Sequence, residues 1–440
     1  MKGYQDLLRD LAPRKFGKRG TIWTTFLLLL IFGGIIAYID QVLKGQQVTN
    51  MRDYALWGIY ISNFVFFIAT SFVGTVTVAI LMLTKNSWRI PFVRIAEIIS
   101  VACIIMAGIT IMIDMARPDR LLNLFIHARP QSPITWDVII IPTYIVVSLL
   151  LLYFPLLPDL SLMKKYFVKQ KPRWSKWYGK LSLGWTGSSA QKAIQTRSIR
   201  IIAIMIIPLG LILQTIDAYL FSTTYRVGWD STNFAPYFIS GAFVAGVGSL
   251  VAVIYVVRKV RRLEAYITEN HLDNLGKFLA LAGLIYIYFN INEYLIPAFM
   301  PKKVESEHLE TLFSGAYALP FWIVTFLGLI LPTLVLLFKK GRKPIPLFIA
   351  GMAMVIGAWW KRYIIVTPTL LHPFLPIQGV PESWRSYFPS FHEWIITSAT
   401  LAMALLIITI MVRVIPVIPI QRVADENGIN IPDKIERDEN

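Results

Sequence analysis

Acidic side chains stand inside or at the ends of long apolar stretches of this sequence. These acids are Glu97, Asp114, Asp137, Asp217, Asp230 and Glu293. A charge near the centre of a bilayer costs about 2.5–3.5 kcal/mol on insertion scales, so such residues persist chiefly where a function needs them. A carboxylate that water solvates poorly accepts a proton more readily, which suits it to proton transfer. The pattern therefore predicts proton chemistry in a membrane protein, with interfacial side chains or structural ion pairs as the alternative.

The sequence contains ten apolar stretches, and each is long enough to cross a bilayer as a helix. The predicted spans are residues 21–43, 57–84, 91–115, 134–157, 199–221, 234–257, 275–296, 312–338, 345–366 and 392–414. The composition agrees, because 55% of the 440 residues are hydrophobic and only 16% are charged. We therefore predict an all-α integral membrane protein of about ten transmembrane helices.

Lysine and arginine gather in every second connection between the spans and give the chain a net charge of +17. The positive-inside rule then places these connections and both termini in the cytoplasm, so we expect no nucleic-acid partner. Most of the acids lie at the outer ends of their spans, while Asp119, Arg120 and Lys361 are expected to be interfacial side chains that reach water or members of structural ion pairs. Glu97 instead lies about 10 Å from the inner end at 1.5 Å per residue. Glu97 is either a proton-relay group or a structural residue that pairs with Arg94 or with a neighbouring helix.

The number and positions of the cysteine and histidine residues exclude several kinds of metal centre on this chain. The single cysteine, Cys103, leaves no disulfide and no thiolate set for a zinc or iron-sulfur site. None of the five histidines falls in mid-span, so the axial ligands of a membrane b-type haem are missing. We expect no metal site here, and redox metals must belong to partner subunits.

A weak repeat predicts how the spans are grouped. Tyr60 opens a Tyr-Ile-Ser-Asn span, and Tyr237 opens a Tyr-Phe-Ile-Ser-Gly span four spans later. The even offset gives both copies one orientation, as in parallel repeats. The expected parts are a cytoplasmic N-terminus (1–20), a peripheral span (21–43), a first four-helix bundle (57–221) with a basic loop (158–198), a second four-helix bundle (234–366), a peripheral last span (392–414) and a cytoplasmic tail (415–440). The basic loop is expected to hold an interfacial amphipathic segment around Trp174 and Trp177.

Several stretches resemble the polysulfide reductase membrane-subunit family (NrfD/PsrC-like). They are WGIYISNFVFFIATSFVGT (57–75), DMARPDRLLNLFIHARPQSPITWDV (114–138), GWTGS (184–188), GWDSTNFAPYFISGAF (228–243), RKVRRLEAYIT (258–268) and RVIPVIPI (413–420). The resemblance is strongest to the ten-span subunits of alternative complex III. It implies a subunit of a prokaryotic cell (inner) membrane that oxidises quinol, either menaquinol or ubiquinol, and that can couple this reaction to proton translocation.

The same resemblance implies partners, since this chain holds neither haem nor an iron-sulfur cluster. Electrons would pass to an outward-facing iron-sulfur or molybdopterin-like subunit. Multihaem or monohaem cytochrome c subunits and a second homologous membrane subunit would complete the assembly in the lipid bilayer.

The resemblance also places a quinone pocket near the outer face. Asp114 and Arg117 fall on the family's H-x-G-R-like segment, and Asp137 falls on its W-D pair. We expect Asp114 or Asp137 to accept the quinol proton, with Arg117 holding the carboxylate in place. The residues expected to contact quinone are Phe72, Trp136, Asp217, Asp230, Tyr237 and Arg362, while Glu97 and Glu293 are expected in a proton path.

Phe72 departs from the family's pattern, because alternative complex III has a pocket histidine at this place. A phenylalanine cannot accept a quinol proton, so either carboxylates take that role or the chain is a structural anchor with a degenerate quinone site. Quinone reduction in sulfur metabolism is a further alternative. A secondary transporter is another, although it would place its polar site near the midplane.

Overall fold

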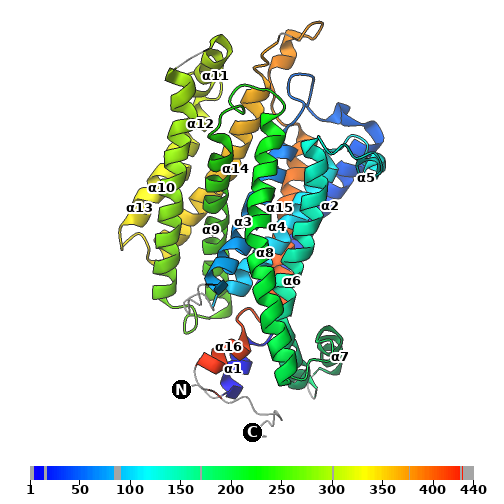
Figure 1. Cartoon of the computed structure of the whole chain (residues 1–440), viewed down its shortest axis with the longest axis vertical. Coiled ribbons are helices and arrows are strands. Elements are labelled where there is room, and N and C mark those ends of the chain that lie inside the picture. The colour runs from blue at the N-terminus through cyan, green and yellow to red at the C-terminus, as the bar shows by residue number, and fades with distance from the viewer. Residues whose placement is uncertain are drawn as a thin grey trace.

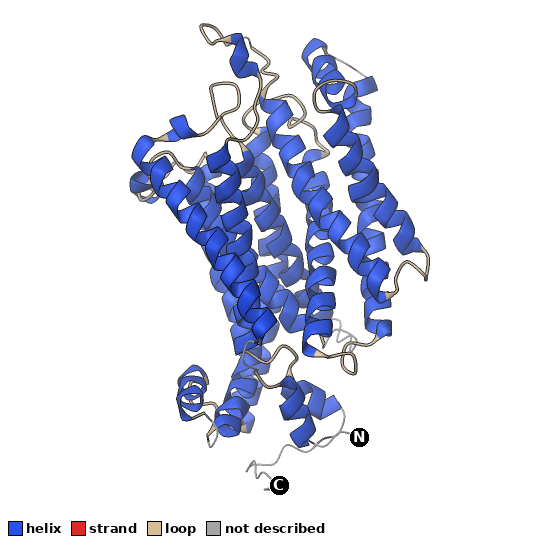
Figure 2. Ribbon diagram, turned by 180° about the vertical axis from the view of Figure 1, so that it is seen from behind, coloured by secondary structure: helices blue, strands red, loops and turns tan. Residues whose placement is uncertain are grey.

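The computed structural model describes residues 4–13, 17–83, 91–168, 171–299, 302–375, 377–426 and 429. The connection between the second and third predicted spans and half of the expected C-terminal tail, residues 427, 428 and 430–440, lie outside these residues. Within the described ranges the chain is helical, with no strand, and ten helices are long and apolar enough to cross a membrane. These helices run side by side along the long axis of the molecule (Figure 1, Figure 2). The predicted all-α fold with ten spans is therefore confirmed.

The spanning helices are α2 (Lys18–Lys44), α3 (Ile59–Leu83), α4 (Val93–Asp114), α6 (Pro133–Phe167), α8 (Ser189–Ser222), α9 (Phe234–Arg261), α10 (Glu269–Phe299), α14 (Pro344–Leu370), α15 (Phe391–Val414) and a broken helix of α12 (Ala318–Thr325), η4 (Phe326–Ile330) and α13 (Leu331–Leu337). Shorter helices are α1 (Tyr4–Leu11), η1 (Gln46–Val48), η3 (Pro118–Arg120), α5 (Asn123–Ile126), α7 (Pro172–Leu181), α11 (Lys303–Phe313), η5 (Glu382–Arg385) and α16 (Ile420–Glu426).

Helix α3 lies at the centre of the helix assembly. It packs against α4, α8, α9 and α14, while α2 and α15 pair with each other and α15 packs against α4 and α3. A helix that is apolar on every side is buried on every side, as α3 is over residues 59–79. Gly246 of α9 allows the close approach, because a Cβ atom there would overlap Val73 of α3. The assignment of residues 57–221 and 234–366 to two repeated bundles stays a prediction.

Two helices extend well beyond their predicted spans into the basic loop. α6 and α8 contain 35 and 34 residues, because their polar ends stay helical past the apolar stretch that hydropathy detects. Pro158 lies inside α6 and lacks the N–H that would bond the Phe154 carbonyl. Gln195 of α8 replaces it, since its amide donates to that carbonyl at 2.6 Å.

The eighth span differs from the predicted continuous helix over residues 312–338. Its middle five residues, Phe326–Ile330, form a π-helix between α12 and α13. Such insertions widen a helix locally. The part of the predicted span before Ala318 lies in α11 and in the turn after it.

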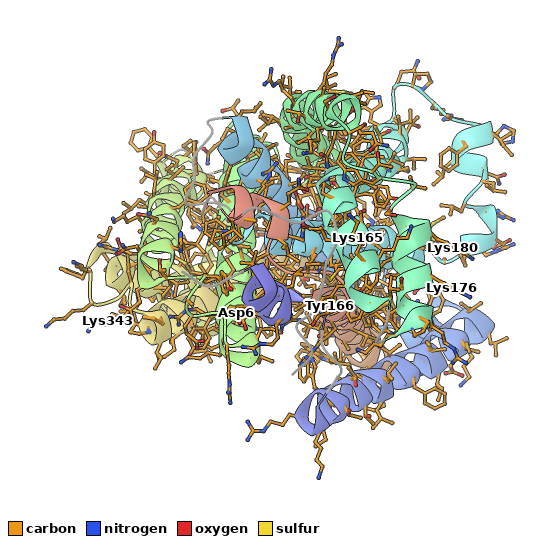
Figure 3. The ribbon with its side chains drawn as sticks, turned by 90° about the horizontal axis from the view of Figure 1, so that it is seen from below. Asp6, Lys165, Tyr166, Lys176, Lys180 and Lys343 are labelled. Carbon is orange, nitrogen blue, oxygen red and sulfur yellow. The ribbon has the colours of Figure 1, made fainter. Side chains whose placement is uncertain are left out.

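Helix α1, before the first span, and helix α16, after the last span, contact each other at one end of the molecule (Figure 1). An even number of crossings requires this arrangement. Figure 3 looks onto this end, where Lys165, Lys176 and Lys180 are labelled. We call it the basic end, and the opposite end, which carries α11, the far end. Helix α7 lies at the basic end with Tyr178 buried and Trp174 and Trp177 partly exposed.

A buried ion pair fastens the C-terminal segment at the basic end. Arg94 Nη1 donates to Asp159 Oδ2 at 2.6 Å and to the Pro416 carbonyl at 3.0 Å. Asp159 also accepts from the backbone N–H groups of Ile420 and Gln421, at 3.3 and 3.1 Å. Arg94 therefore pairs with α6 and not with Glu97, which was one of its predicted partners.

Replacing Asp159 by Ala should destabilise the protein by about 3–5 kcal/mol, because the Arg94 charge would stay buried without its partner. Thermal unfolding in detergent, followed by circular dichroism, measures the change. Asp119→Asn is the matched control, since Asp119 belongs to an exposed pair with Arg117 and its loss should leave the melting temperature unchanged. A melting temperature equal to that of the parent in Asp159→Ala would contradict a stabilising role for the pair.

Candidate functional site

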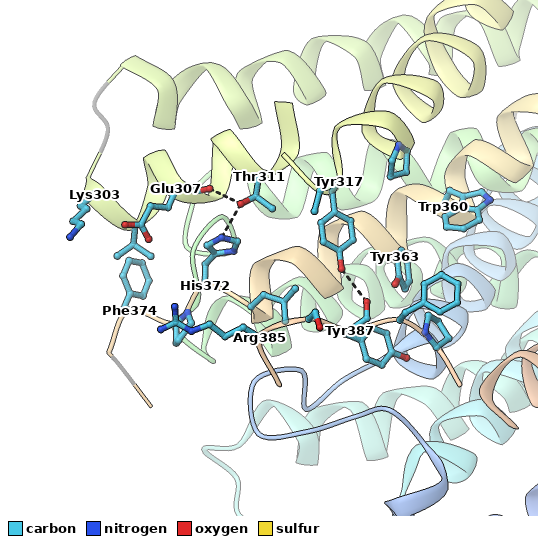
Figure 4. Close-up of a pocket in the computed structure, with 18 of the residues that line it drawn as sticks. Lys303, Glu307, Thr311, Tyr317, Trp360, Tyr363, His372, Phe374, Arg385 and Tyr387 are labelled. Atoms are coloured by element: carbon cyan, nitrogen blue, oxygen red, sulfur yellow. Dashed lines mark hydrogen bonds between the residues drawn. The ribbon is translucent and has the colours of Figure 1, made fainter. Parts of the chain in front are cut away.

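A cavity of about 840 Å³ opens at the far end, between α11, the start of α12, the end of α14 and the start of α15 (Figure 4). We call it the far-end cavity. Its aromatic walls are formed by Tyr317, Trp360, Tyr363, Phe374, Tyr387, Phe388 and Trp394. Its charged and imidazole groups are Lys303, Glu307, His372 and Arg385. Aromatic walls with a few polar groups suit a flat, largely apolar ligand with polar atoms at its edge.

Hydrogen bonds hold the polar groups of this wall in place. The Thr311 hydroxyl donates to the Glu307 carbonyl at 2.8 Å and lies 3.1 Å from His372 Nε2. The Tyr317 hydroxyl donates to the Tyr387 carbonyl at 3.3 Å, and Figure 4 shows both connections. Burial raises the pKa of Tyr317 to about 12, so its hydroxyl keeps its proton near neutral pH.

Tyr387 connects the cavity wall to a buried carboxylate. Its hydroxyl donates to Glu393 Oε1 at 2.5 Å and accepts from the Ile59 N–H at 3.0 Å. The other oxygen of Glu393 accepts from the N–H groups of Ser390 and Asn50, at 2.8 and 2.9 Å. Burial, and then the neighbouring Glu393 carboxylate, raise the pKa of Tyr387. The connection before α15 is thus fixed to the helix N-terminus by a capping box.

Asp114 lies near this carboxylate, at the end of α4. It is half-buried, its Oδ1 atom has no hydrogen-bond partner among the described residues, and its charge interacts with that of Glu393. Arg117 does not hold it, which corrects our expectation. Arg117 is 60% exposed and donates two hydrogen bonds to Asp119, at 2.9 and 2.8 Å, because that acid shares its short turn.

A second group of charges lies between α6, α8 and α14. Asp217 is 0% exposed, and neither of its oxygens has a hydrogen-bond partner among the described residues. Its charge interacts with those of Asp137 and Arg362, which are also buried. Arg362 donates to the Phe238 carbonyl at 3.3 Å. The structure therefore brings these three predicted residues together, but none of them lines the far-end cavity.

Glu293 belongs to a third polar group, on α10. Its Oε2 atom accepts from Ser231 and Asn233, each at 2.9 Å, so the loop before α9 is tied to α10. Tyr237 and the exposed Asp230 join Glu293 around a small cavity of about 40 Å³. Three of the predicted residues thus share this place.

Lys361 and His308 are buried close to this third group, and the sequence analysis selected neither as a site residue. Lys361 is 2% exposed and donates to the Tyr294 hydroxyl at 2.9 Å, so the expectation that it reaches water at the interface is wrong. Its charge interacts with that of Glu293, and its expected role in a structural ion pair stays a prediction. This part of α14 faces α10 and α12 instead of water. His308 of α11 lines the small cavity. Burial, together with the nearby His372, lowers the pKa of His308 to about 3, so its ring is neutral at neutral pH.

Phe72 and Trp136 were both expected to contact quinone, and neither lines the far-end cavity. Phe72 is 0% exposed and packs edge-on against Phe243, with ring centroids 5.6 Å apart, and against Gly210. Trp136 is 38% exposed, and its indole N–H donates to the Pro130 carbonyl at 2.7 Å. Phe72 fills the interior of the helix assembly, while Trp136 belongs to its surface.

Glu97 stands apart from the other acids, as the sequence analysis expected. It is 2% exposed on α4, and neither carboxylate oxygen has a hydrogen-bond partner among the described residues. Its charge interacts with those of Arg94 and Arg422, both towards the basic end. A buried carboxyl group with open hydrogen-bonding capacity is able to exchange a proton with water that reaches it.

The far-end cavity contains residues that the sequence analysis did not select. His372 and Tyr387 stand in the connection expected over residues 367–391, which carried no periodic pattern. One signal was available, because Ser390 and Glu393 have the Ser-x-x-Glu spacing of a capping box. The spacing marks the start of a helix, but it does not show that a tyrosine binds the same carboxylate.

Residues 47–373 match the family described as "Polysulphide reductase, NrfD". The chain is 26% identical over 354 residues to a putative membrane subunit of dimethyl sulfoxide reductase from Halobacterium salinarum, covering 80% of this chain and 78% of the relative. It is 21% identical to the "Menaquinone reductase, integral membrane subunit" of Nitratidesulfovibrio vulgaris, covering 90% and 92%. It is 23% identical to the "Hdr-like menaquinol oxidoreductase integral membrane subunit" of Archaeoglobus fulgidus, covering 91% and 95%.

Proposed function

Because the chain belongs to the polysulphide reductase NrfD family, we propose that it is a quinone- or quinol-interacting membrane subunit of an oxidoreductase complex. Two relatives support this proposal, since their names describe membrane subunits of a menaquinone reductase and of a menaquinol oxidoreductase. The observation that carries it is the far-end cavity, whose aromatic walls and polar edge fit a quinone ring.

The residues of the far-end cavity fit a quinone in size and chemistry. Its volume of about 840 Å³ falls in the usual range of small-molecule sites, roughly 300–1,000 Å³. Trp360 and Trp394 offer flat apolar surfaces, and Tyr317 and His372 offer polar atoms for the ring oxygens. A bound quinol supplies two electrons and two protons when it is oxidised. The electrons would leave to a partner subunit, which we propose is an outward-facing iron-sulfur or molybdopterin-like protein.

Proton handling falls to the carboxylates behind the cavity wall. The Tyr387 hydroxyl donates a hydrogen bond to Glu393, and the charge of Glu393 interacts with that of Asp114. We propose that Asp114, one of the two acids expected in this role, accepts protons released at the cavity, with the Glu393 carboxylate and not Arg117 as its charged neighbour. Asp137, Asp217 and Arg362 form a separate buried group.

From the resemblance alone, we also propose which complex the chain belongs to. It would be like alternative complex III, with cytochrome c subunits and a second homologous membrane subunit. It would oxidise menaquinol or ubiquinol in a prokaryotic inner membrane, with the basic end in the cytoplasm.

Filling the far-end cavity should abolish quinone binding. Ala316→Trp places an indole against its lining, whereas Ser314→Trp in the same turn changes an exposed residue outside it. The measurement is fluorescence-detected binding of a quinone-site inhibitor to the purified complex, together with extraction of bound quinone. We expect loss in Ala316→Trp and parental binding in Ser314→Trp. Parental binding in both variants, or a parent complex without quinone, would favour a structural anchor.

Replacing Asp114 by Asn should lower quinol-linked turnover by at least about 100-fold, the scale of a lost general base, while quinone stays bound. Stopped-flow reduction of an electron acceptor, with the integrity of the complex checked on a native gel, measures this effect. Asp119→Asn is the matched control, because Asp119 follows in the next, exposed turn. Unchanged turnover in Asp114→Asn would remove Asp114 from the proton path.

Replacing Glu97 by Gln should lower the number of protons moved per electron pair, if Glu97 and Glu293 conduct protons through the helix assembly. The two acids lie on α4 and α10, and among the described residues Glu97 has no hydrogen-bond partner that would fix it as a structural group. A pH-sensitive dye in liposomes that contain the complex gives the stoichiometry. Cys103→Ser on the same helix is the control. A parental stoichiometry in Glu97→Gln would leave this residue outside the path.

A further inference from the structure

A cavity of about 250 Å³ opens at the basic end, between α6, α8 and the C-terminal segment. We call it the basic-end cavity. Its lining includes Asp159, Trp185, Lys192 and Arg422. None of them belongs to the far-end cavity, which lies at the opposite end of the helices.

The GWTGS motif builds one wall of this cavity. Gly184 and Gly187 have φ angles of +70° and +82°, which a glycine adopts without strain. The backbone N–H groups of Thr186 and Gly187 donate to the Gln191 side chain, at 2.9 and 3.1 Å. The turn thus joins the start of α8 and sets Trp185 against the cavity. The proposed quinone chemistry gives this motif no role.

The charge of the basic-end cavity is positive. Lys192 and Arg422 line it, and neither forms an ion pair or hydrogen bond with its side chain within the described ranges. Asp159 is the acid in its lining, but Arg94 and two backbone N–H groups already occupy its oxygens. Glu97 feels the charge of Arg422 without a hydrogen bond to it. Two cations therefore face this cavity without a bound acid.

The two cations would attract an anion, and the position of the cavity indicates the chemical class of that anion. It lies where the predicted spans 134–157 and 199–221 meet the basic loop, which is the expected membrane boundary. Trp185 is typical of that depth. Large apolar side chains of α8 are exposed just beyond it towards the membrane, including Ile201, Ile204 and Met205. An anion at this boundary whose attached groups are apolar has the chemistry of a phospholipid.

We propose that the basic-end cavity binds the phosphate of an anionic glycerophospholipid, held by Lys192 and Arg422. Arginine and lysine side chains donate charge-assisted hydrogen bonds to phosphate oxygens. Basic pockets between helices at this side of a membrane bind anionic head groups in the same way. The acyl chains lie along the exposed apolar face of α8. The lipid thereby joins α6, α8 and the C-terminal segment.

Native mass spectrometry of the full chain in detergent tests this proposal by titration with phosphatidylglycerol, cardiolipin and phosphatidylcholine. The Lys192→Gln/Arg422→Gln double variant should bind the two anionic lipids at least about tenfold more weakly, since it loses two charge-assisted contacts. The Lys176→Gln/Lys180→Gln variant is the matched control, because it removes the same charge from the exposed face of α7 at the same end. It should bind like the parent.

Three results would overturn the proposal. Equal weakening in both double variants would indicate general attraction to the basic end. Equal affinity of the parent for phosphatidylcholine would exclude recognition of the anionic head group. Displacement of bound lipid by millimolar inorganic phosphate, with phosphate retained in the spectra, would assign the cavity to the free anion.

Discussion

A charged group in the hydrocarbon core of a bilayer must find its partner within the protein, because the acyl chains offer neither hydrogen bonds nor counter-charge. The Arg94–Asp159 pair meets this requirement at the basic end, and it also binds the segment that follows the last span. The same requirement applies to a backbone carbonyl that a proline inside a helix leaves without its hydrogen bond. The carbonyl that Pro158 leaves free receives the Gln195 amide of the neighbouring helix. The polar contacts between helices thus follow from the apolar solvent around them.

At the far end, polar groups can also pair with water, and the proposed quinone chemistry is located there. Helix ends and connections meet water at this level, so aromatic rings and hydrogen-bonding groups are able to line one cavity. Behind it, Glu393 accepts from several donors and is held firmly, whereas Asp114 keeps one buried oxygen without a partner among the described residues. A carboxylate that is fully hydrogen-bonded supports structure. A carboxylate with an open oxygen is available for protons.

Some charged residues lie where the sequence predicted them, and others have different partners or surroundings. Asp137, Asp217 and Arg362 were selected separately and lie together, because each faces inward from its own helix. Arg117 was assigned to Asp114, but it pairs with Asp119 since local partners in one turn need no tertiary contact. Lys361 was expected either to reach water at the interface or to form an ion pair, and it is buried against Tyr294, where its charge interacts with that of Glu293. Hydropathy reports the depth of a residue, but not the helix face on which it stands.

By itself, the sequence determined that the chain crosses a membrane about ten times as helices, because unpaired backbone groups in lipid leave a chain few other forms. It also determined the family, since its motifs extend along most of the chain. Tertiary structure alone decided the length of α6 and α8, the π-helix in the eighth span and the partner of Arg94. It also decided where the two cavities lie. The partner of Arg94 and the two cavities depend on side chains from helices far apart in the sequence, and their meeting is set by packing.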